Sequence, residues 1–388
     1  MAHHTAHHHR YFANPEELLT NFEEHKELLA SLDRINVFNP PVHTCSTGWE
    51  FHGLYTGPTS VAYLFYRLSS VYPGLDLKDQ SLLDWAKEYL DLGSRVDHKS
   101  PTPSHCGIAN EILARLALSA AIEQETSFVE ELCAYEPIIN SSKDDGSNEW
   151  LYGRAGWLYL LRLCRAAFQQ SGTKAETTLK LLNKTIDKTV SRILRVPQPW
   201  TWHGSQYLGA AHGTLSVITQ VVLSRPTTAP PLQLLLSRVL DRQFESGNFP
   251  SSVPGSGHDR LVQFCHGGPG FVLSLRSLLP YFSGSLGDKM RLAIARAQFD
   301  VRERGVLRKE PCLCHGVAGN ALALDDDESF RVFLSCMATN SMKKLGWMKE
   351  KTRNEESASL YTGEAGRAWV WAVAEMNLPR TCIGYNDL

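Results

Sequence analysis

The tripeptide Cys-His-Gly occurs twice in this 388-residue chain, at residues 265–267 and 314–316. Cysteine thiolates and histidine nitrogens are the ligands that zinc prefers, and a catalytic zinc site combines three protein ligands with one open position. A pair of thiolates also favours zinc over magnesium or calcium. Cys265, Cys314 and one neighbouring histidine are therefore predicted to bind a zinc ion.

The two cysteines occupy equivalent positions in an internal repeat. Each lies two residues before a glycine, as does Ala211, which His212 follows in the preceding copy. Equivalent positions on consecutive repeats become spatial neighbours when the repeats stack. Cys312 is the alternative ligand in the sixth copy, but only Cys314 matches the register of Cys265.

The second copy carries the same residue types in reversed order, as His105-Cys106 before Gly107, and this pair is a weaker candidate for a fourth ligand. The chain has nine cysteines, an odd number, and a chain of this length needs no disulfides for stability, so reduced thiols are expected. Three further cysteines stand in apolar helical sequence and are expected in the core: Cys133, Cys164 and Cys336.

The repeat unit consists of a glycine, two residues, a second small residue and an apolar stretch, and it recurs seven times. The first glycines are Gly57, Gly107, Gly153, Gly213, Gly267, Gly316 and Gly363. They lie 46 to 60 residues apart, which suits one pair of helices with its loops. Between the copies, stretches such as 82–92, 177–194 and 232–244 repeat apolar residues at i, i+3, i+4 and i+7, which is helical spacing.

Each copy is expected to pair an apolar inner helix with an amphipathic outer helix, and neither can bury its apolar surface without a neighbour. The glycine at each inner helix start would allow a close backbone approach or a positive φ. The sequence therefore predicts an all-α fold, an α/α toroid of seven helical pairs that spans residues 21–388 as one domain. An open superhelix of the same pairs is the alternative. Residues 1–20 are expected to form a flexible, His-rich tail.

The composition argues against several classes of partner. The chain has 39 Lys and Arg against 41 Asp and Glu, a net charge of −2, so no nucleic-acid partner or anionic membrane surface is expected. No apolar run approaches the roughly 18 residues that span a bilayer. The first residues also lack the apolar core of a secretory signal. A cytoplasmic protein without a transmembrane segment is the expectation.

The segments around these motifs resemble the LanC-like family, which comprises bacterial lanthionine synthetase cyclases and their eukaryotic relatives. The similar segments are WLYGRAG at 150–156, LGAAHG at 208–213, SGNFP at 246–250, FCHGGPG at 264–270 and LCHGVAGN at 313–320. YGRAG, GAAHG and the two Cys-His-Gly motifs are closer to the eukaryotic branch than to the bacterial cyclases. The resemblance implies a toroid of seven inner and seven outer helices, in agreement with the number of repeats.

The resemblance also implies roles for single residues. The family's zinc ligands match Cys265, Cys314 and His315. His212 matches a histidine that acts as acid or base in the cyclases, and Glu149 falls where they carry an acidic residue implicated in catalysis. His266, which follows a ligand cysteine, is the third candidate for proton transfer.

The activity that the resemblance implies is zinc-dependent addition of a thiol to an electrophilic alkene. Zinc favours the thiolate, which is the nucleophile. The eukaryotic branch implies glutathione as the thiol and a dehydroalanine or dehydrobutyrine residue in a peptide or protein as the acceptor. Lys309 matches a lysine near the family's pocket, and with Arg154 it is expected to bind glutathione carboxylates; a structural ion pair is the alternative for Arg154.

Other functions remain open at this stage. The chain could be a non-catalytic scaffold that binds zinc and glutathione, or it could form thioethers in specialised metabolism, including lanthionine-type cyclisation. The carboxylates of residues 325–328 could hold magnesium for a terpene cyclase, although a solvated acidic loop is favoured. These carboxylates stand where relatives continue an apolar helix. Residues 310–312 lack the glycines typical of the family, and copies one, two and four lack the second glycine.

Overall fold

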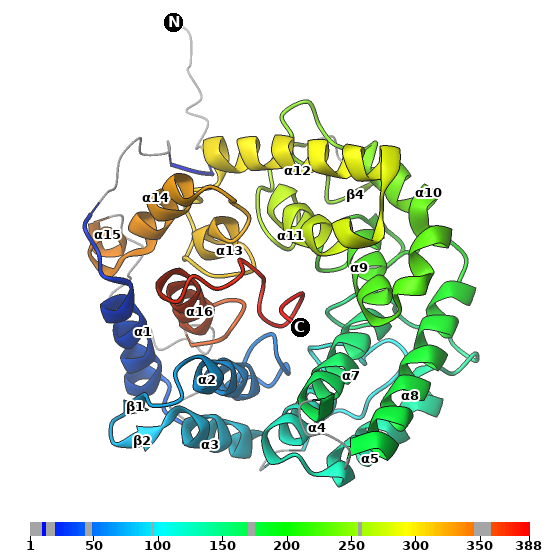
Figure 1. Cartoon of the computed structure of the whole chain (residues 1–388), viewed down its shortest axis with the longest axis horizontal. Coiled ribbons are helices and arrows are strands. Elements are labelled where there is room, and N and C mark those ends of the chain that lie inside the picture. Colours follow the sequence, from blue (N-terminus) through cyan, green and yellow to red (C-terminus); the bar gives the residue numbers. More distant parts are fainter. Residues whose placement is uncertain are drawn as a thin grey trace, which may run out of the picture.

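The computed structural model describes residues 10–12, 20–42, 49–94, 97–169, 175–254, 258–344 and 358–388. In this part of the chain, seven inner helices surround a centre, and an outer helix packs behind each of them (Figure 1). The inner helices are α2 (Pro58–Val71), α4 (Glu111–Glu123), α7 (Arg154–Gln169), α9 (Thr214–Ser224), α11 (Gly268–Leu278), α13 (Val317–Ala321) and α16 (Glu364–Glu375). Their outer partners, in the same order, are α3 (Leu82–Ser94), α5 (Thr126–Ala134), α8 (Glu176–Arg195), α10 (Ala229–Leu240), α12 (Gly284–Arg304), α14 (Asp327–Met337) and α1 (Glu24–Phe38). The predicted α/α toroid is confirmed.

The first outer helix closes the ring. Helix α1 comes first in the sequence but packs against α16, the last inner helix, and α16 also packs against α2. The seventh helical pair is therefore made from the two ends of the chain, and an open superhelix is excluded. No helix in the described residues combines the length and apolar character needed to cross a bilayer.

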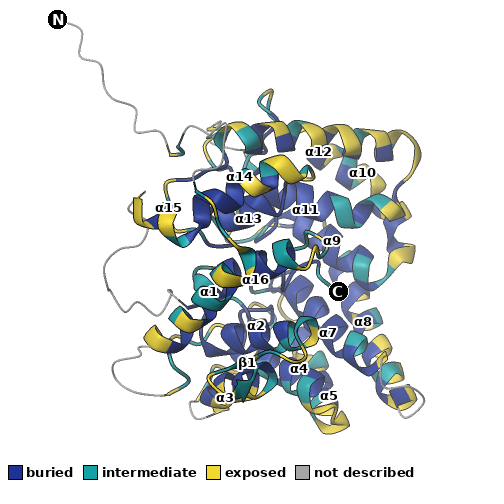
Figure 2. Cartoon of the chain, turned by 60° about the vertical axis from the view of Figure 1, so that its left-hand side comes forward, coloured by how far each residue is buried: buried dark blue, intermediate teal, exposed yellow. Residues whose placement is uncertain are grey.

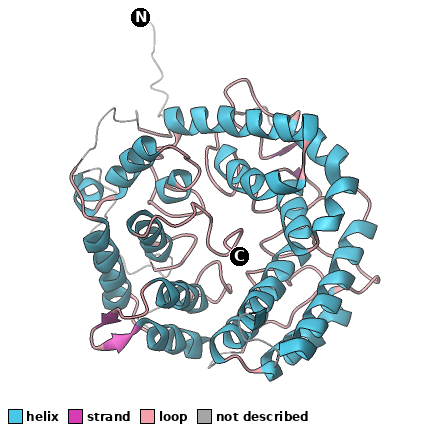
Figure 3. Cartoon of the chain, in the orientation of Figure 1, coloured by secondary structure: helices cyan, strands magenta, loops and turns pink. Residues whose placement is uncertain are grey.

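The short elements lie in the connections between helices (Figure 3). Two antiparallel ribbons join β1 (Asp76–Leu77) to β2 (Gln80–Ser81) and β3 (Gln206–Tyr207) to β4 (Ser252–Val253). The remaining short turns of helix are α6 (Glu136–Ile139), η2 (Pro226–Thr228), η3 (Leu279–Tyr281) and α15 (Thr339–Lys344). The β3–β4 ribbon links the loops of copies four and five, on which much of the candidate site lies.

Inner and outer helices differ in burial as their sequences predict (Figure 2). The outer helix α8 buries Leu182, Ile186, Val190 and Ile193, which repeat at intervals of three and four residues, and it exposes the opposite face. The inner helix α9 is buried over nearly its whole length. Helix α9 contacts the inner helices α7 and α11 as well as its outer partner α10, and it carries no charged residue.

Close backbone contacts explain the glycines at the inner helix starts. Gly267 precedes α11 with a φ of +127°, a conformation that L-residues rarely adopt. The second glycine, Gly270, lies so close to the preceding loop that a Cβ atom would stand 2.1 Å from the carbonyl oxygen of Phe264. The same approach to a carbonyl six residues earlier recurs at Gly156, Gly319 and Gly366.

Two copies without the second glycine use a serine instead. The hydroxyls of Ser60 and Ser216 donate hydrogen bonds to the carbonyls of Gly57 and Gly213, at 2.6 and 2.8 Å. Serine therefore satisfies a backbone acceptor at the same helix start. In copy two, the Asn110 side chain accepts from the amide of Leu113 and caps α4.

The sixth copy departs from the others because its inner helix is short. Helix α13 ends at Ala321, and the acidic stretch follows it. Asp326 accepts a hydrogen bond from the amide of Ser329 at 2.7 Å and caps α14, while Asp325 and Asp327 form ion pairs with arginines. These carboxylates thus stabilise loops and a helix start. Their partners are a backbone amide and arginine side chains, as expected for a structural acidic loop.

Part of the N-terminal segment departs from the expected flexible tail. The amide of Phe12 donates to the carbonyl of Val306 at 2.8 Å, and the amide of Arg308 donates to the carbonyl of Arg10 at 2.9 Å. Residues 10–12 thus lie along residues 306–308. The rest of the predicted tail, residues 1–9 and 13–19, lies outside the described residues.

Candidate active site

A closed circle of backbone hydrogen bonds joins the loops that precede the seven inner helices. In each bond, the amide of one copy donates to a carbonyl of a neighbouring copy. The bonds run from Tyr361 to Tyr55 (3.1 Å), Cys314 to Tyr361 (2.9 Å), Cys265 to Cys314 (3.1 Å), Ala211 to Cys265 (3.4 Å), Trp150 to Ala211 (3.3 Å), Ile108 to Trp150 (3.5 Å) and Leu54 to Ile108 (2.9 Å). Leu54 precedes Tyr55, so the circle closes. The loops converge at one end of the ring, as the repeat predicts.

Cys265 and Cys314 are consecutive members of this circle, and their buried thiols contact each other. The hydrogen bond with the Cys314 thiol lowers the pKa of Cys265, while the same bond and burial raise the pKa of Cys314. Of the two thiols, Cys265 is therefore the one that loses its proton more readily. Cys312, the alternative in the same copy, is buried among backbone amides, and burial raises its pKa to about 12.

Each thiol of the pair also receives a hydrogen bond from another side chain. The Tyr55 hydroxyl donates to Cys314 Sγ at 3.0 Å, and the amide nitrogen of Gln263 donates to Cys265 Sγ at 3.0 Å. The ammonium group of Lys309 in turn donates to Gln263 Oε1 at 3.2 Å. Two donors and the nearby charge of Lys309 thus stabilise negative charge on this pair of sulfurs.

His315 is the third predicted zinc ligand, and the structure does not gather it with the thiols. Within the described residues, no three His, Cys, Asp or Glu side chains are arranged so that they could hold one metal ion. Burial and then Lys309 lower the pKa of His315 to about 4, so its ring is neutral near pH 7, as a metal ligand must be. The donor chemistry of Cys265, Cys314 and His315 therefore fits zinc, and the three-ligand site stays a prediction.

Glu149 and His212, which come from copies three and four, form a hydrogen-bonded pair. His212 Nδ1 lies 2.9 Å from Glu149 Oε2. The same carboxylate accepts from the amides of Leu151 at 2.7 Å and Tyr152 at 2.5 Å, so its position is fixed by its own loop. The pair has the arrangement of an acid/base histidine oriented by a carboxylate.

Aromatic rings hold the imidazole of His212 from several sides. The Trp202 ring lies parallel to it, with ring centroids 3.9 Å apart. Tyr152 continues the parallel arrangement at 6.0 Å from Trp202, and the Tyr207 ring meets His212 edge-on at 5.9 Å. These contacts restrict rotation of the imidazole and leave Nε2 as the ring nitrogen available for proton transfer.

His266 lies beside the pair, with its ring centroid 6.0 Å from that of His212. Burial, then His212 and Lys309, lower its pKa to about 4. Its Nδ1 is buried and has no hydrogen-bond partner within the described part of the chain. The structure therefore brings together Glu149, His212 and His266, the three residues predicted to be catalytic.

Arg154 lies among the carbonyls of the loop that precedes α7. It is completely buried, and its guanidinium donates to the carbonyls of Ile139 at 2.9 Å and Asp145 at 2.7 Å and to the side chain of Asn148 at 3.0 Å. These bonds hold the loop that leads to Glu149. The structure thus gives Arg154 a structural role through loop carbonyls, whereas Lys309 lies beside the thiols.

The candidate fourth ligands of copy two lie outside the thiol pair. The Cys106 thiol donates to the carbonyl of Pro103 at 3.8 Å, and burial raises its pKa to about 12. The ring of His105 lies 5.8 Å from that of Tyr152. The cysteines predicted for the core, Cys133, Cys164 and Cys336, are all buried.

Some residues of the site were not predicted from the sequence. Tyr55 lies two residues before Gly57, which is the register of Cys265 and Cys314, so a comparison of all seven copies at this position would have indicated it. Gln263 and Trp202 have no such signal. They lie in loops of unequal length, where position in the repeat says little about position in space.

Comparisons with known proteins agree with the fold and with the motifs. The family model described as lanthionine synthetase C-like protein matches residues 48–373. The chain is 27% identical to glutathione S-transferase LANCL1 of Danio rerio over 286 residues, which cover 69% of this chain and 67% of that protein. It is 28% identical to LanC-like protein GCL1 of Arabidopsis thaliana over 244 residues, or 58% of this chain, and spans only 54% of that relative's length.

A solved structure of nisin cyclase has the same fold. It superimposes with a TM-score of 0.55 over 92% of this chain and 94% of its own, at 13% sequence identity. The family match covers all but the ends of the sequence and includes the Cys-His-Gly turns, the Glu149–His212 pair and most of the toroid. The chain therefore belongs to the lanthionine synthetase C-like family.

Proposed function

We propose that this protein joins a thiol to an electrophilic alkene, with glutathione as the thiol and a dehydroalanine or dehydrobutyrine residue of a peptide or protein as the acceptor. The contact between the thiols of Cys265 and Cys314, beside the Glu149–His212 pair, carries this proposal. The names of the relatives support it, because LANCL1 is called a glutathione S-transferase and nisin cyclase a cyclase.

Cys265, Cys314 and His315 are the residues that would hold zinc. Zinc bound there would lower the pKa of an incoming thiol so that the thiolate forms near neutral pH. The hydrogen bonds from Tyr55 and Gln263 would stabilise the two protein sulfurs in their charged form.

His212 would donate the proton that completes the addition and then take up the proton that the thiol loses. The glutathione sulfur bonds to the β-carbon of the alkene, and the π electrons move toward the carbonyl as an enolate. A protonated His212 then delivers a proton to the α-carbon and becomes a neutral imidazole. The proton lost by the thiol restores the imidazolium, so the net reaction adds S–H across C=C. Glu149 stabilises the imidazolium through the bond at His212 Nδ1.

Lys309 is linked to the thiol pair through Gln263, and its ammonium group would bind a carboxylate of glutathione. A cavity of about 520 Å³, lined by residues that include Tyr152, His105 and Lys99, would receive the acceptor. Tyr152 connects this cavity with the acid/base pair, because its ring also lies parallel to that of His212, with centroids 6.1 Å apart.

The proposal is tested by mass spectrometry of the metal content and of the product formed from glutathione and a dehydroalanine peptide. The wild-type protein is expected to bind zinc and to convert the peptide to its glutathione adduct. Cys314→Ala is expected to lose both, because it removes one of two contacting sulfurs. Cys312→Ala, which removes a buried thiol of the same loop, is the matched control and should retain both.

Retention of zinc and of full activity by Cys314→Ala would contradict the site. Failure of the wild-type protein to form any adduct would contradict the proposed reaction. A peptide that carries its own cysteine separates adduct formation from cyclisation in the same assay, because cyclisation leaves its mass unchanged.

A further inference from the structure

The last residues of the described chain fill the centre of the toroid. After α16 the chain turns inward, and Figure 1 shows its end at the middle of the ring. Cys382, Ile383 and Tyr385 have no exposed surface, and the Asp387 side chain is 1% exposed. Residues 382–387 are called the central segment below. A buried segment with this many polar groups must have partners for them.

Asp387 connects the central segment to inner helices α2 and α7. Its carboxylate accepts hydrogen bonds from the hydroxyls of Tyr159 at 2.8 Å and Tyr63 at 3.1 Å, and it forms an ion pair with Arg67. The amide of Gly384 donates to the same carboxylate at 2.9 Å. One buried carboxylate thus fixes both the turn of the segment and its position against two helices.

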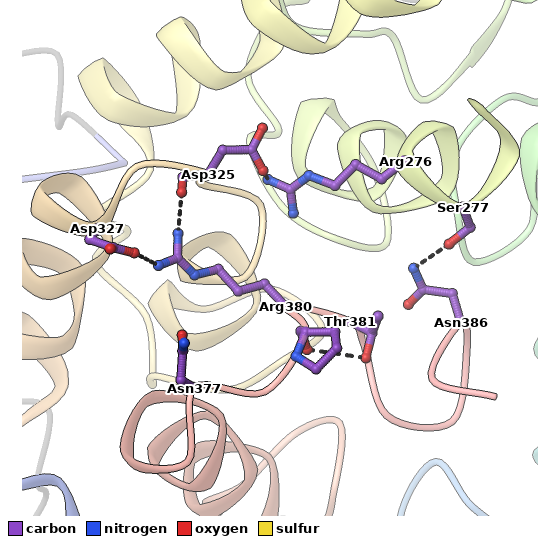
Figure 4. A pocket seen from close by; sticks show the side chains of 9 residues that line it. Arg276, Ser277, Asp325, Asp327, Asn377, Arg380, Thr381 and Asn386 are labelled. Atoms are coloured by element: carbon purple, nitrogen blue, oxygen red, sulfur yellow. Dashed lines mark hydrogen bonds and ion pairs between the residues drawn. The ribbon is translucent and has the colours of Figure 1, made fainter. Parts of the chain in front are cut away.

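Asn386 and Tyr385 connect the segment to α9 and α11. The Asn386 amide nitrogen donates to the carbonyl of Leu273 at 3.0 Å. It also donates to Ser277 Oγ at 2.9 Å (Figure 4). Gln220 donates to the carbonyl of Tyr385 at 2.8 Å. The segment is therefore held by inner helices from both halves of the ring.

Three aromatic rings also contact the central segment. The ring of Tyr385 meets Trp150 and Phe264 edge-on, with centroids 5.3 and 5.2 Å apart. Trp150 Nε1 donates to the carbonyl of Gly384 at 3.2 Å, and the hydroxyl of Tyr361 donates to the carbonyl of Ile383 at 2.6 Å. Edge-to-face contacts fix ring orientation as well as separation.

Each supported ring is next to a residue of the candidate site. Trp150 follows Glu149, and Phe264 precedes Cys265. The carbonyl of Tyr361 accepts from the amide of Cys314. Through these three rings, the position of the central segment determines where the carboxylate of Glu149 and the thiols of Cys265 and Cys314 lie.

We propose that the central segment is the floor of the active site and that Tyr385 is a positioning residue for Glu149 and Cys265. This inference rests on the proposed thiol addition. Tyr385 does not touch the reacting atoms and acts by fixing the rings of Trp150 and Phe264. Small displacements of the sulfurs from the acid/base pair would slow the chemical step without removing any substrate contact.

The test compares Tyr385→Leu, Tyr385→Phe and a matched control in a steady-state assay of glutathione addition to a dehydroalanine peptide. Tyr385→Leu keeps a buried apolar side chain but removes the ring, and its kcat should fall by about 10- to 100-fold while KM for both substrates changes little. Tyr385→Phe keeps the ring and should restore kcat to the wild-type value. Phe65→Leu, an equally buried change on the outer side of α2, should lower Tm without lowering kcat.

A Tyr385→Leu protein that folds and keeps the wild-type kcat would overturn the positioning role. The role would also be overturned if Tyr385→Leu and Phe65→Leu lowered kcat by the same factor. If Tyr385→Leu fails to fold, Asp387→Asn is measured by the same criteria, because it preserves volume and loosens the segment. Absence of turnover in the wild-type protein would count against the proposed function instead, so the two failures are distinguishable.

Discussion

At the scale of single residues, the position of Glu149 is fixed before it meets any substrate. Two backbone amides of its own loop bind the carboxylate, and Arg154 binds the carbonyls of the preceding residues. Because the Glu149 side chain is already ordered, its hydrogen bond to His212 costs little additional conformational entropy. A rigid carboxylate is needed because it must hold the imidazole in one tautomer while the proton moves at the other nitrogen.

Glu149→Gln tests this role. A glutamine side chain keeps the size but cannot stabilise the imidazolium of His212, so kcat should fall by about 100-fold or more, with little change in KM for glutathione. Steady-state kinetics with a dehydroalanine peptide measures the effect. Glu136→Gln, in which the altered carboxylate pairs with Lys188 on the outer layer, is the control and should retain wild-type kcat. Equal kcat values for the two variants would exclude Glu149 from the chemistry.

At the scale of elements, the start of each inner helix with a complete motif packs directly against the loop that precedes it, and these loops carry the site residues. The second glycine of each complete motif lies against the carbonyl of the residue six positions earlier, and in copy five this is Phe264, the neighbour of Cys265. In copy six it is Leu313, the neighbour of Cys314. The glycines that reveal the repeat in the sequence thus place the thiols in the structure.

Gly270→Ala and Gly268→Ala separate this contact from a general effect on α11. A Cβ at Gly270 would lie 2.1 Å from the Phe264 carbonyl oxygen, whereas a Cβ at Gly268 would have its nearest neighbour at 3.4 Å. Gly270→Ala should lower the free energy of unfolding by about 1–3 kcal/mol and weaken zinc binding, because the carbonyl must shift and Cys265 with it. Gly268→Ala should do neither. Denaturant unfolding and zinc titration measure the two effects; similar values for both variants would contradict the argument.

At the scale of the molecule, much of the architecture follows from the sequence. Seven glycine motifs at a period near 50 residues predicted the toroid, and the common register of Cys265 and Cys314 predicted their contact. The alignment of the repeat copies does not predict the conformation of the loops, so the hydrogen bond from Gln263 and the stacking of Trp202 were not predicted. The packing of α1 against α16 was also not predicted, because no sequence motif near either helix indicates it. It depends on how the whole ring closes.

Ring closure depends on a buried group of charges between α1 and α16. Arg34 donates to the carboxylate of Glu364 at 2.8 Å, and Arg367, which is 1% exposed, lies 3.2 Å from the same carboxylate. Glu27 of α1 completes the group by pairing with Arg367 at 3.2 Å. Burial opposes the charge of Glu364, but the two arginines outweigh it and lower its pKa. Removing the charge of Glu364 would leave the two arginines with one carboxylate of this group, that of Glu27.

Glu364→Gln should therefore lower the free energy of unfolding by about 3 kcal/mol near pH 7. A carboxyl whose pKa is lowered in the folded state contributes stability above its unfolded pKa of about 4.3 and loses it as the pH falls toward the folded value. The deficit of the variant should thus shrink below about pH 4. Glu176→Gln, which breaks the exposed pair with Lys180, is the control and should change stability little. Thermal unfolding monitored by circular dichroism between pH 3 and 8 tests this, and a deficit independent of pH would show that lost packing at Glu364, and not its charge, holds the ring closed.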